Sequence, residues 1–411
     1  MSVLAQTADP SSLGFDPARL ARIDEHFKPF VDDGRLPGWQ LAVARDGEIA
    51  HVSKYGWMDV ESKRPIQDDT IYRIASMTKP ICGVAAMILW EEGLFELKDY
   101  VYRFIPSFRD QKVFRSGSTN APRLDNINEP MEMWHLFTHT AGLTYGFMYS
   151  HSVDQMYRNA GFEWGVPRDA DLAGICDMLA ALPLLFQPGA EWNYSMSIDV
   201  LGRIVEVLSG MKLGEFMKKR IFDPLGMTDT AFHCPEDKKD RLATAYTMNP
   251  ADRKAMRMPD APMSFYADPK AHMGGGGLVS TMSDYMKFAL MLRGGGELNG
   301  VRILSPRTVD YMATNHLPGG ADLSQYGRAL FSETAFDGVG FGLSMSVTLD
   351  PAKAKVPGSV GDYGWGGAYS TIFTVDPAED LVYMLMTQLL PSSAHPIRPQ
   401  FKQMVHQALV D

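Results

Sequence analysis

The stretch Tyr72-Arg73-Ile74-Ala75-Ser76-Met77-Thr78-Lys79-Pro80 joins a short apolar run to a long apolar segment, 81–94. If Ser76 opens a helix over that segment, Ser76 and Lys79 lie on one face of it, one turn apart. The free backbone N–H groups of a helix N-terminus point to the same place. The spacing therefore predicts that a hydroxyl, an amine and anion-stabilising donors meet within one turn, with Ser76 as a catalytic nucleophile.

The Ser-x-x-Lys spacing is common, and a second copy occurs at Ser209-Gly210-Met211-Lys212. That copy follows an apolar helical pattern, so Gly210 is predicted to cap a helix and Lys212 to belong to the next segment. For the first copy, the alternative is an N-cap serine followed by a solvated lysine. A strand-like run before Ser76 and a buried-looking helix after it favour Ser76, but context alone leaves both interpretations open.

Composition limits the classes of function. The 411 residues suffice for one large domain or two of ordinary size, with 45% apolar and 21% charged residues. The net charge of −10 argues against nucleic acid or an anionic membrane as a partner, because phosphate binding needs clustered Lys and Arg. No uninterrupted apolar stretch reaches about 18 residues, so no membrane span is expected.

The cysteines and the N-terminus indicate a compartment. Cys82, Cys176 and Cys234 are far apart and show no C-x-x-C spacing, so neither a metal site nor a disulfide framework is expected. Residues 1–14 lack the charged and apolar regions of a secretory signal. These features predict a cytoplasmic protein, and the alternative is a mature form from which a signal has been removed.

Strand patterns concentrate in the two ends of the chain. Asp46-Gly47 between 39–45 and 49–55 predicts a β-hairpin. Asp16-Pro17 predicts the start of a helix that closes at Asp33-Gly34. Further strands are expected over 71–75, 278–281, 341–349, 369–375 and 381–387, and further helices over 76–93, 284–292 and 398–410.

The middle of the chain has a different character. From about 99 to 225, helical patterns such as 170–181 and 198–208 alternate with loops, and strand patterns are scarce. We therefore expect an α+β fold with an antiparallel sheet flanked by helices, built from 1–98 and 226–411. A mostly helical domain, 99–225, is expected beside it, with the active site at their interface.

Acyl transfer by a serine needs a base for its proton and donors for the oxyanion. No serine here has glycine at both −2 and +2, which argues against an α/β-hydrolase. Lys79 can serve as the base if desolvation leaves its amine neutral. Tyr194, which follows Pro188-Gly189-Ala190-Glu191-Trp192-Asn193, could share or relay the proton, and the alternative is a tyrosine packed at a helix start.

Two glycine-rich stretches are candidates for close backbone approach. Gly364-Trp365-Gly366-Gly367-Ala368 leads into a strand pattern, and an N–H there could complete an oxyanion hole. The alternative of equal weight is a hairpin turn. Gly274-Gly275-Gly276-Gly277 lacks the G-x-G-x-x-G spacing, so a tight backbone crossing is preferred to a phosphate loop.

The remaining conspicuous side chains are predicted to be structural. His139 has no carboxylate or cysteine at ligand spacing, so it is interpreted as structural. The cluster of Tyr145, Phe147, Met148 and Tyr149 is core by default. The alternative is an adaptable apolar pocket for an acyl or alcohol group.

Four motifs occur in one order along nearly the whole chain, and as a set they resemble the family VIII carboxylesterases. These are serine hydrolases with the fold of class C β-lactamases and penicillin-binding proteins. The motifs are Ser76-Met77-Thr78-Lys79, Thr138-His139-Thr140-Ala141-Gly142-Leu143, Tyr194-Ser195-Met196 and Trp365-Gly366-Gly367.

The resemblance implies an acyl-enzyme mechanism without metal or cofactor. Ser76 would attack the ester carbonyl, and Lys79 and Tyr194 would deprotonate it and later activate water. The oxyanion would be held by the backbone N–H groups of Ser76 and Ala368. Trp365, Gly366 and Gly367 would line the substrate site.

Two departures from the β-lactamase pattern bear on the substrate. Tyr194-Ser195-Met196 stands where those enzymes carry Tyr-x-Asn, so the amide that orients a β-lactam is missing. Trp365-Gly366-Gly367 stands where they carry Lys-Thr-Gly, so the cation for a drug carboxylate is missing. A neutral site favours uncharged esters over lactams that bear a carboxylate.

The sequence thus predicts a carboxylesterase for short-chain or aryl esters, with a small-molecule substrate. The first alternative is an acyltransferase that passes the acyl group to an alcohol, similar to the lovastatin acyltransferases. Weak β-lactamase or D-peptidase activity is another. A catalytically silent binding module is disfavoured by the intact Ser76, Lys79 and Tyr194. The oligomeric state does not follow from the sequence.

Overall fold

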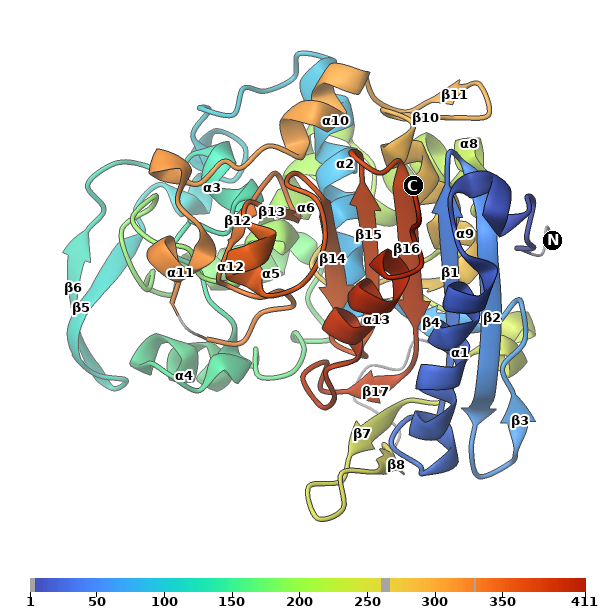
Figure 1. Cartoon of the computed structure of the whole chain (residues 1–411). Helices are drawn as coiled ribbons and strands as arrows, with labels where there is room; N and C mark the ends of the chain where they lie inside the picture. The colour runs from blue at the N-terminus through green and yellow to red at the C-terminus, as the bar shows by residue number, and fades with distance from the viewer. Residues whose placement is uncertain (1–3, 260–266, 329) are drawn as a thin grey trace.

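The computed structural model describes residues 4–259, 267–328 and 330–411, and its centre is an eight-stranded sheet in which neighbouring strands are antiparallel. The strand order is β12-β13-β14-β15-β16-β1-β2-β3, so both ends of the chain contribute to the sheet (Figure 1). The strands are β1 (Gly38–Arg45), β2 (Glu48–Asp59), β3 (Arg64–Pro65), β12 (Val339–Phe341), β13 (Ser346–Thr348), β14 (Tyr363–Gly367), β15 (Thr371–Asp376) and β16 (Leu381–Met386).

Alternating side chains of the central strands divide between two cores. In β1, Leu41 and Val43 face one core, while Ala42 and Ala44 face the other. β16 pairs with β1 in antiparallel register and divides in the same way. Successive side chains of a strand point to opposite faces of the sheet. Because both faces are buried here, the central strands are apolar at nearly every position.

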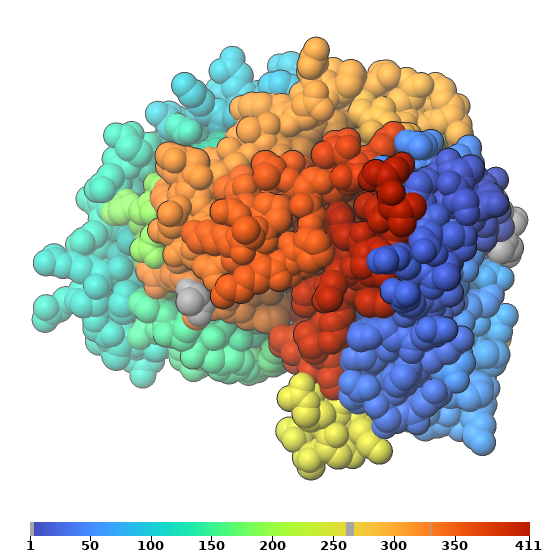
Figure 2. Space-filling view, in the orientation of Figure 1, coloured from blue at the N-terminus to red at the C-terminus, as the bar shows by residue number. Residues whose placement is uncertain are grey.

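Helices cover both faces of the sheet. The first face is covered by α1 (Pro17–Asp32) and α13 (Ile397–His406), which lie side by side in Figures 1 and 2. Asp16 caps α1 by accepting the N–H groups of Ala18 and Arg19, as the Asp-Pro start predicted. The other face packs on α9 (Met282–Arg293) and on the buried α2 (Thr78–Glu91).

The middle of the chain is mostly helical, and with the sheet this confirms the predicted α+β class. The helices there are α3 (Met133–Phe137), α4 (Ser152–Asn159), α5 (Leu172–Ala180), α6 (Ser197–Ser209), α7 (Leu213–Met217), a π-helical turn (Lys218–Phe222) and α8 (Asp223–Leu225). One hairpin in this region, β5 (Lys112–Ser118) with β6 (Ala121–Asn126), was not predicted. Its strands are polar and largely exposed, so they carry no apolar alternation.

Smaller elements complete the described chain. The remaining strands are β4 (Ile71–Arg73), β7 (Tyr246–Met248), β8 (Ala255–Arg257), β9 (Val279–Thr281), β10 (Glu297–Leu298), β11 (Val301–Arg302) and β17 (Leu389–Leu390). The remaining α-helices are α10 (Pro306–Met312), α11 (Leu323–Tyr326) and α12 (Pro351–Ala354), and the 3₁₀ turns span Pro10–Leu13, Ala75–Met77, Val101–Arg103, Pro106–Phe108, Gly146–Met148, Glu236–Arg241 and Pro318–Gly320. Across the described ranges, no helix combines the length and apolarity that a membrane crossing requires.

Two predictions about strands were wrong in detail. The segment 341–349 is not one strand, because the chain reverses between β12 and β13. Ser344 adopts a left-handed φ of 73° there, and a Cβ on Gly342 would lie 2.1 Å from the Met312 carbonyl oxygen. The Trp365-Gly366-Gly367 stretch does precede a strand, β15, but the prediction missed that the stretch is itself the strand β14. Its hairpin turn follows at 368–370.

Candidate active site

Ser76 lies in a tight turn between the core strand β4 and the buried helix α2. β4 pairs with β9, and the chain then enters the 3₁₀ turn Ala75–Met77 before α2 begins at Thr78. Ala75 has a left-handed φ of 43°, a strained conformation for a residue with a Cβ. Strain of this kind is common at functional sites, and here it presents Ser76 at 9% exposure.

Lys79 lies one turn further and faces Ser76, as the spacing predicted. Its side chain is fully buried, and its Nζ lies 3.2 Å from the Ser76 Oγ. The same Nζ donates to the carbonyl oxygen of Gly275 at 2.5 Å. A neutral amine held by this carbonyl can direct its lone pair at the Ser76 hydroxyl and take its proton.

Burial is the main influence on the Lys79 amine. It lowers the pKa of Lys79 to about 8, against the opposing charges of Asp199 and Glu333. Asp199, at the start of α6, is itself buried, and burial raises its pKa to about 6 although the Lys79 charge acts in the opposite direction. Lys79 is therefore a base whose neutral form is accessible near neutral pH.

The four glycines 274–277 form the tight backbone crossing that the sequence predicted. A Cβ on Gly274 would lie 2.6 Å from the Cys82 Sγ, and one on Gly275 would lie 2.6 Å from an Asp199 carboxylate oxygen. Close approach lets the Gly275 N–H donate to Asp199 at 2.7 Å while the Gly275 carbonyl accepts from Lys79. The crossing thus links Asp199 to Lys79.

Tyr194 comes from the loop that enters α6 and covers Lys79. Its ring centroid lies 4.5 Å from the Lys79 Nζ. Within the described residues its hydroxyl makes no hydrogen bond of good geometry, although the Ser76 and Trp365 side chains are near enough to lower its pKa in part. Burial dominates and raises the pKa of Tyr194 well above its usual range, so the phenol stays protonated and is suited to relay a proton.

Residues 365–368 (the glycine box) lie at the end of β14 next to the Ser76 turn. A Cβ on Gly367 would lie 2.2 Å from the Ile74 carbonyl oxygen, so this approach requires glycine. Ala368 follows and packs against the apolar cluster that contains Ala75. The Trp365 ring lies 5.6 Å from the Tyr194 ring. The structure therefore brings Ser76, Lys79, Tyr194 and the 365–368 box together.

Ser209, from the second Ser-x-x-Lys copy, lies at the end of a helix, and His139 lies buried beside Tyr194. Ser209 is the last residue of α6, where its Oγ donates to the Val205 carbonyl and Gly210 caps the helix in the left-handed region. His139 is fully buried with its ring 5.1 Å from the Tyr194 ring, and burial lowers its pKa well below the usual range. His139 thus supports Tyr194 as a neutral side chain.

Aromatic rings form a stack that runs from the buried amine to the surface. Tyr145 lies 5.5 Å from the Lys79 Nζ, Phe147 stacks on Tyr145 at 4.6 Å, and Trp164 stacks on Phe147 at 5.2 Å. Trp164 is 63% exposed. The sequence indicated Tyr145 and Phe147 as part of a possible pocket. Trp164 was not predicted to join them, because it lies outside that cluster in the sequence.

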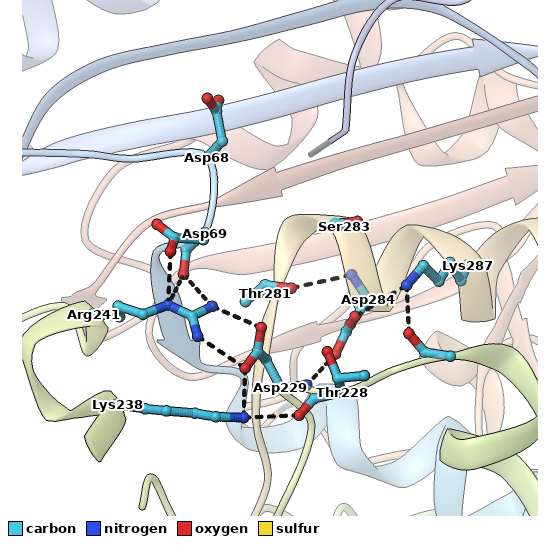
Figure 3. A pocket seen from close by; sticks show the side chains of 11 residues that line it. Asp68, Asp69, Thr228, Asp229, Lys238, Arg241, Thr281, Ser283, Asp284 and Lys287 are labelled. Carbon is cyan, nitrogen blue, oxygen red and sulfur yellow. Dashed lines mark hydrogen bonds and ion pairs between the residues drawn. The ribbon is translucent and has the colours of Figure 1, made fainter. Parts of the chain in front are cut away.

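A separate polar hollow of about 530 Å³ lies away from these residues (Figure 3). Arg241 lies between Asp69 and Asp229, Lys238 pairs with Asp229, and Lys287 with Asp284. None of the predicted site residues lines this hollow. These ion pairs, with the Asp229 N–H that donates to Asp284, form a network that joins the loop before β4 to α9.

Comparisons with known proteins find relatives that match nearly the whole chain. An uncharacterized protein of Mycobacterium tuberculosis is 36% identical over 363 residues, which cover 88% of each chain. The esterase EstB of Burkholderia gladioli is 32% identical over 402 residues, covering 93% of this chain and 94% of the esterase. The solved structure of EstCE1, a hydrolase with promiscuous acyltransferase activity, has a TM-score of 0.79 at 26% identity and covers 96% of this chain and 99% of its own.

More distant structures confirm the predicted fold. A penicillin-binding protein homologue from Caulobacter crescentus has a TM-score of 0.69 at 18% identity and covers 96% of this chain. The family model described as Beta-lactamase matches residues 23–404. The chain therefore belongs to the beta-lactamase family.

Proposed function

We propose that this protein is a carboxylesterase of the family VIII type, which cleaves short-chain or aryl esters through an acyl-enzyme on Ser76. The observation that carries the proposal is the distance of 3.2 Å between the Ser76 Oγ and a buried Lys79 amine whose pKa is lowered to about 8. The similarity to the esterase EstB over nearly the whole chain supports the same reaction.

The proposed mechanism has two steps. The neutral Lys79 amine takes the Ser76 proton, and the Ser76 oxygen attacks the ester carbonyl carbon. Backbone N–H groups of Ser76 and Ala368 hold the resulting oxyanion. When the ester C–O bond breaks, the departing alcohol receives the proton from the Lys79 ammonium through Tyr194. A water molecule then loses a proton by the same route, attacks the acyl-enzyme and releases the acid.

The residues present support an uncharged ester as substrate. Trp365 occupies the motif position where β-lactamases have a lysine, and its ring packs on Tyr194 and Phe341. Met196 stands at the motif position where β-lactamases have the asparagine, and its buried thioether side chain supplies no amide. We therefore propose at most weak β-lactamase activity.

Acyl transfer to an alcohol is the second candidate. It is favoured by two relatives: EstCE1, whose acyltransferase activity is described as promiscuous, and a monacolin J acid methylbutanoyltransferase of Aspergillus terreus that is 28% identical over 406 residues. The mechanism differs only in which molecule attacks the acyl-enzyme.

A cytoplasmic location, as expected from the sequence, remains part of the proposal.

The function is tested by product analysis. With p-nitrophenyl butyrate in water, we expect butyric acid and p-nitrophenol in equal amounts, and nitrocefin turnover far below ester turnover. The same assay with excess alcohol measures the ratio of new ester to acid. Mostly ester would favour the acyltransferase, and nitrocefin turnover equal to ester turnover would contradict the esterase.

Trp164→Ala is expected to weaken binding of aryl esters selectively. Removing the exposed end of the ring stack takes away an aromatic contact, a loss of about 1 kcal/mol or about 5-fold in KM. KM for a phenyl ester should rise by that factor, while KM for a methyl ester and both kcat values stay within experimental error. Tyr311→Ala is a matched control, because Tyr311 is another exposed aromatic residue and it stacks on Trp90 instead. Equal changes for both esters would contradict the role of Trp164.

A further inference from the structure

Arg398 lies in the first turn of α13, on the face of the sheet that α1 and α13 cover, and its side chain extends to the glycine box. Its Nη2 donates to the Gly367 carbonyl oxygen at 2.7 Å and to the Thr371 carbonyl oxygen at 2.9 Å. These two carbonyls flank the turn 368–370 that joins β14 to β15. One guanidinium therefore ties together both ends of the turn that carries Ala368.

The first of these bonds acts on one particular peptide unit. The Gly367 carbonyl and the Ala368 N–H belong to the same planar peptide, in which C=O and N–H point in opposite directions. A cation that holds the carbonyl on one side consequently fixes the direction of the N–H on the other side. It also draws electron density from the amide and makes its N–H a stronger donor.

The surroundings of Arg398 keep the guanidinium in this position. Glu333, which is 3% exposed, forms an ion pair with Nη2 at 2.8 Å, and its backbone carbonyl accepts from Nη1 at 3.0 Å. A Cβ on Gly366 would lie 2.5 Å from the guanidinium carbon. Gly366 is thus required for Arg398 to lie against β14, just as Gly367 is required for β14 to lie against the Ser76 turn.

We infer that Arg398 is a positioning residue for the oxyanion hole: held by Glu333, it orients and polarises the 367–368 peptide so that the Ala368 N–H meets the oxyanion. This inference rests on the proposed function, because it assigns to Arg398 a part in the same acyl transfer. Within the described part of the chain, its hydrogen bonds go to the backbone carbonyls of Glu333, Gly367 and Thr371 and not to Ser76. Its effect on the oxyanion passes through the Gly367 carbonyl.

α13 offers a matched comparison one turn further on. Lys402 pairs with Asp362, a carboxylate that is also 3% exposed, at 2.7 Å. This pair joins the same helix to the same side of the sheet, but Lys402 does not contact the glycine box. Lys402→Met therefore removes a comparable structural ion pair and leaves the oxyanion donor as it is.

The test measures kcat, KM and the inhibition constant of a boronic acid that forms a tetrahedral adduct with the serine. Arg398→Gln is expected to lower kcat by about 10- to 100-fold, somewhat less than the 10²–10³-fold for loss of a whole oxyanion donor. KM should change little, because the ground-state carbonyl gains less from this donor than the oxyanion does. The inhibition constant of the boronic acid should rise by the same factor as kcat falls.

Several variants keep the outcome interpretable. If Arg398→Gln fails to fold, Arg398→Lys carries the test, because it weakens the contact with the Gly367 carbonyl and should lower kcat less than Arg398→Gln would. Glu333→Gln also removes a charge that raises the pKa of Lys79, so its kcat is compared on the plateau at high pH, where Lys79 is neutral in both proteins. Lys402→Met should keep wild-type kcat whatever its melting temperature. An unchanged boronic acid inhibition constant in the Arg398 and Glu333 variants, or equal loss of kcat in Lys402→Met, would overturn the inference. Failure of the wild-type protein to hydrolyse esters would instead contradict the proposed function.

Discussion

Ser76→Ala is expected to lower kcat for p-nitrophenyl butyrate by at least about 10⁴-fold, the scale found when the nucleophile of a covalent mechanism is removed. Lys79 lies 3.2 Å from the Ser76 Oγ, Tyr194 lies near both side chains, and Gly367 lies against the Ile74 carbonyl just before Ser76. Without the Ser76 Oγ these groups have nothing to deprotonate or to stabilise. KM should change little, since alanine leaves the shape of the site intact.

Ser209→Ala is the control for this change, because Ser209 also belongs to a Ser-x-x-Lys sequence. Its Oγ is engaged with the Val205 carbonyl at the end of α6, so the variant should keep wild-type kcat. A fluorophosphonate probe should add its mass to the peptide that contains Ser76 and to no other. Labelling elsewhere, or esterase activity that is lost at 209 and kept at 76, would contradict the proposed mechanism.

Local patterns in the sequence were sufficient for the parts of the fold with strong periodicity. The Asp46-Gly47 hairpin and the Asp16-capped helix lie where the sequence predicted them, because turn chemistry and capping act over a few residues. The same holds for the distinction between Ser76 and Ser209. Ser209 is followed by Gly210, which ends a helix, whereas Ser76 lies between a strand and a buried helix.

Other parts of the site depend on contacts between distant segments, which no local pattern reveals. Asp199, Glu333 and Arg398 are ordinary charged residues in the sequence, and only the fold brings them to Lys79 and the glycine box. The glycine box itself was expected before a strand, since Gly lowers β-propensity, but tertiary contact overrides that preference. Its glycines are needed for what lies against them, the Ile74 carbonyl and the Arg398 guanidinium.

Lys79→Met is expected to lower kcat/KM by about 10³-fold, within the range for loss of a positioned general base. Methionine has a similar length and fits a buried site, so the loss should come from the missing amine and not from unfolding. In the wild type, the reactive form is the neutral amine. Because burial lowers the pKa of Lys79 to about 8, kcat/KM should rise with pH and level off above about pH 8.

Asp199→Asn tests whether this pH dependence belongs to Lys79. The negative charge of Asp199 raises the pKa of Lys79, so its removal should move the rise of kcat/KM to lower pH. Asn keeps an oxygen that can accept the Gly275 N–H, so the backbone crossing should persist. Asp284→Asn is the control: Asp284 is also buried, but it accepts the Asp229 N–H and does not act on Lys79. A pH profile that moves equally in both variants, or in neither, would assign the titration to a group other than Lys79.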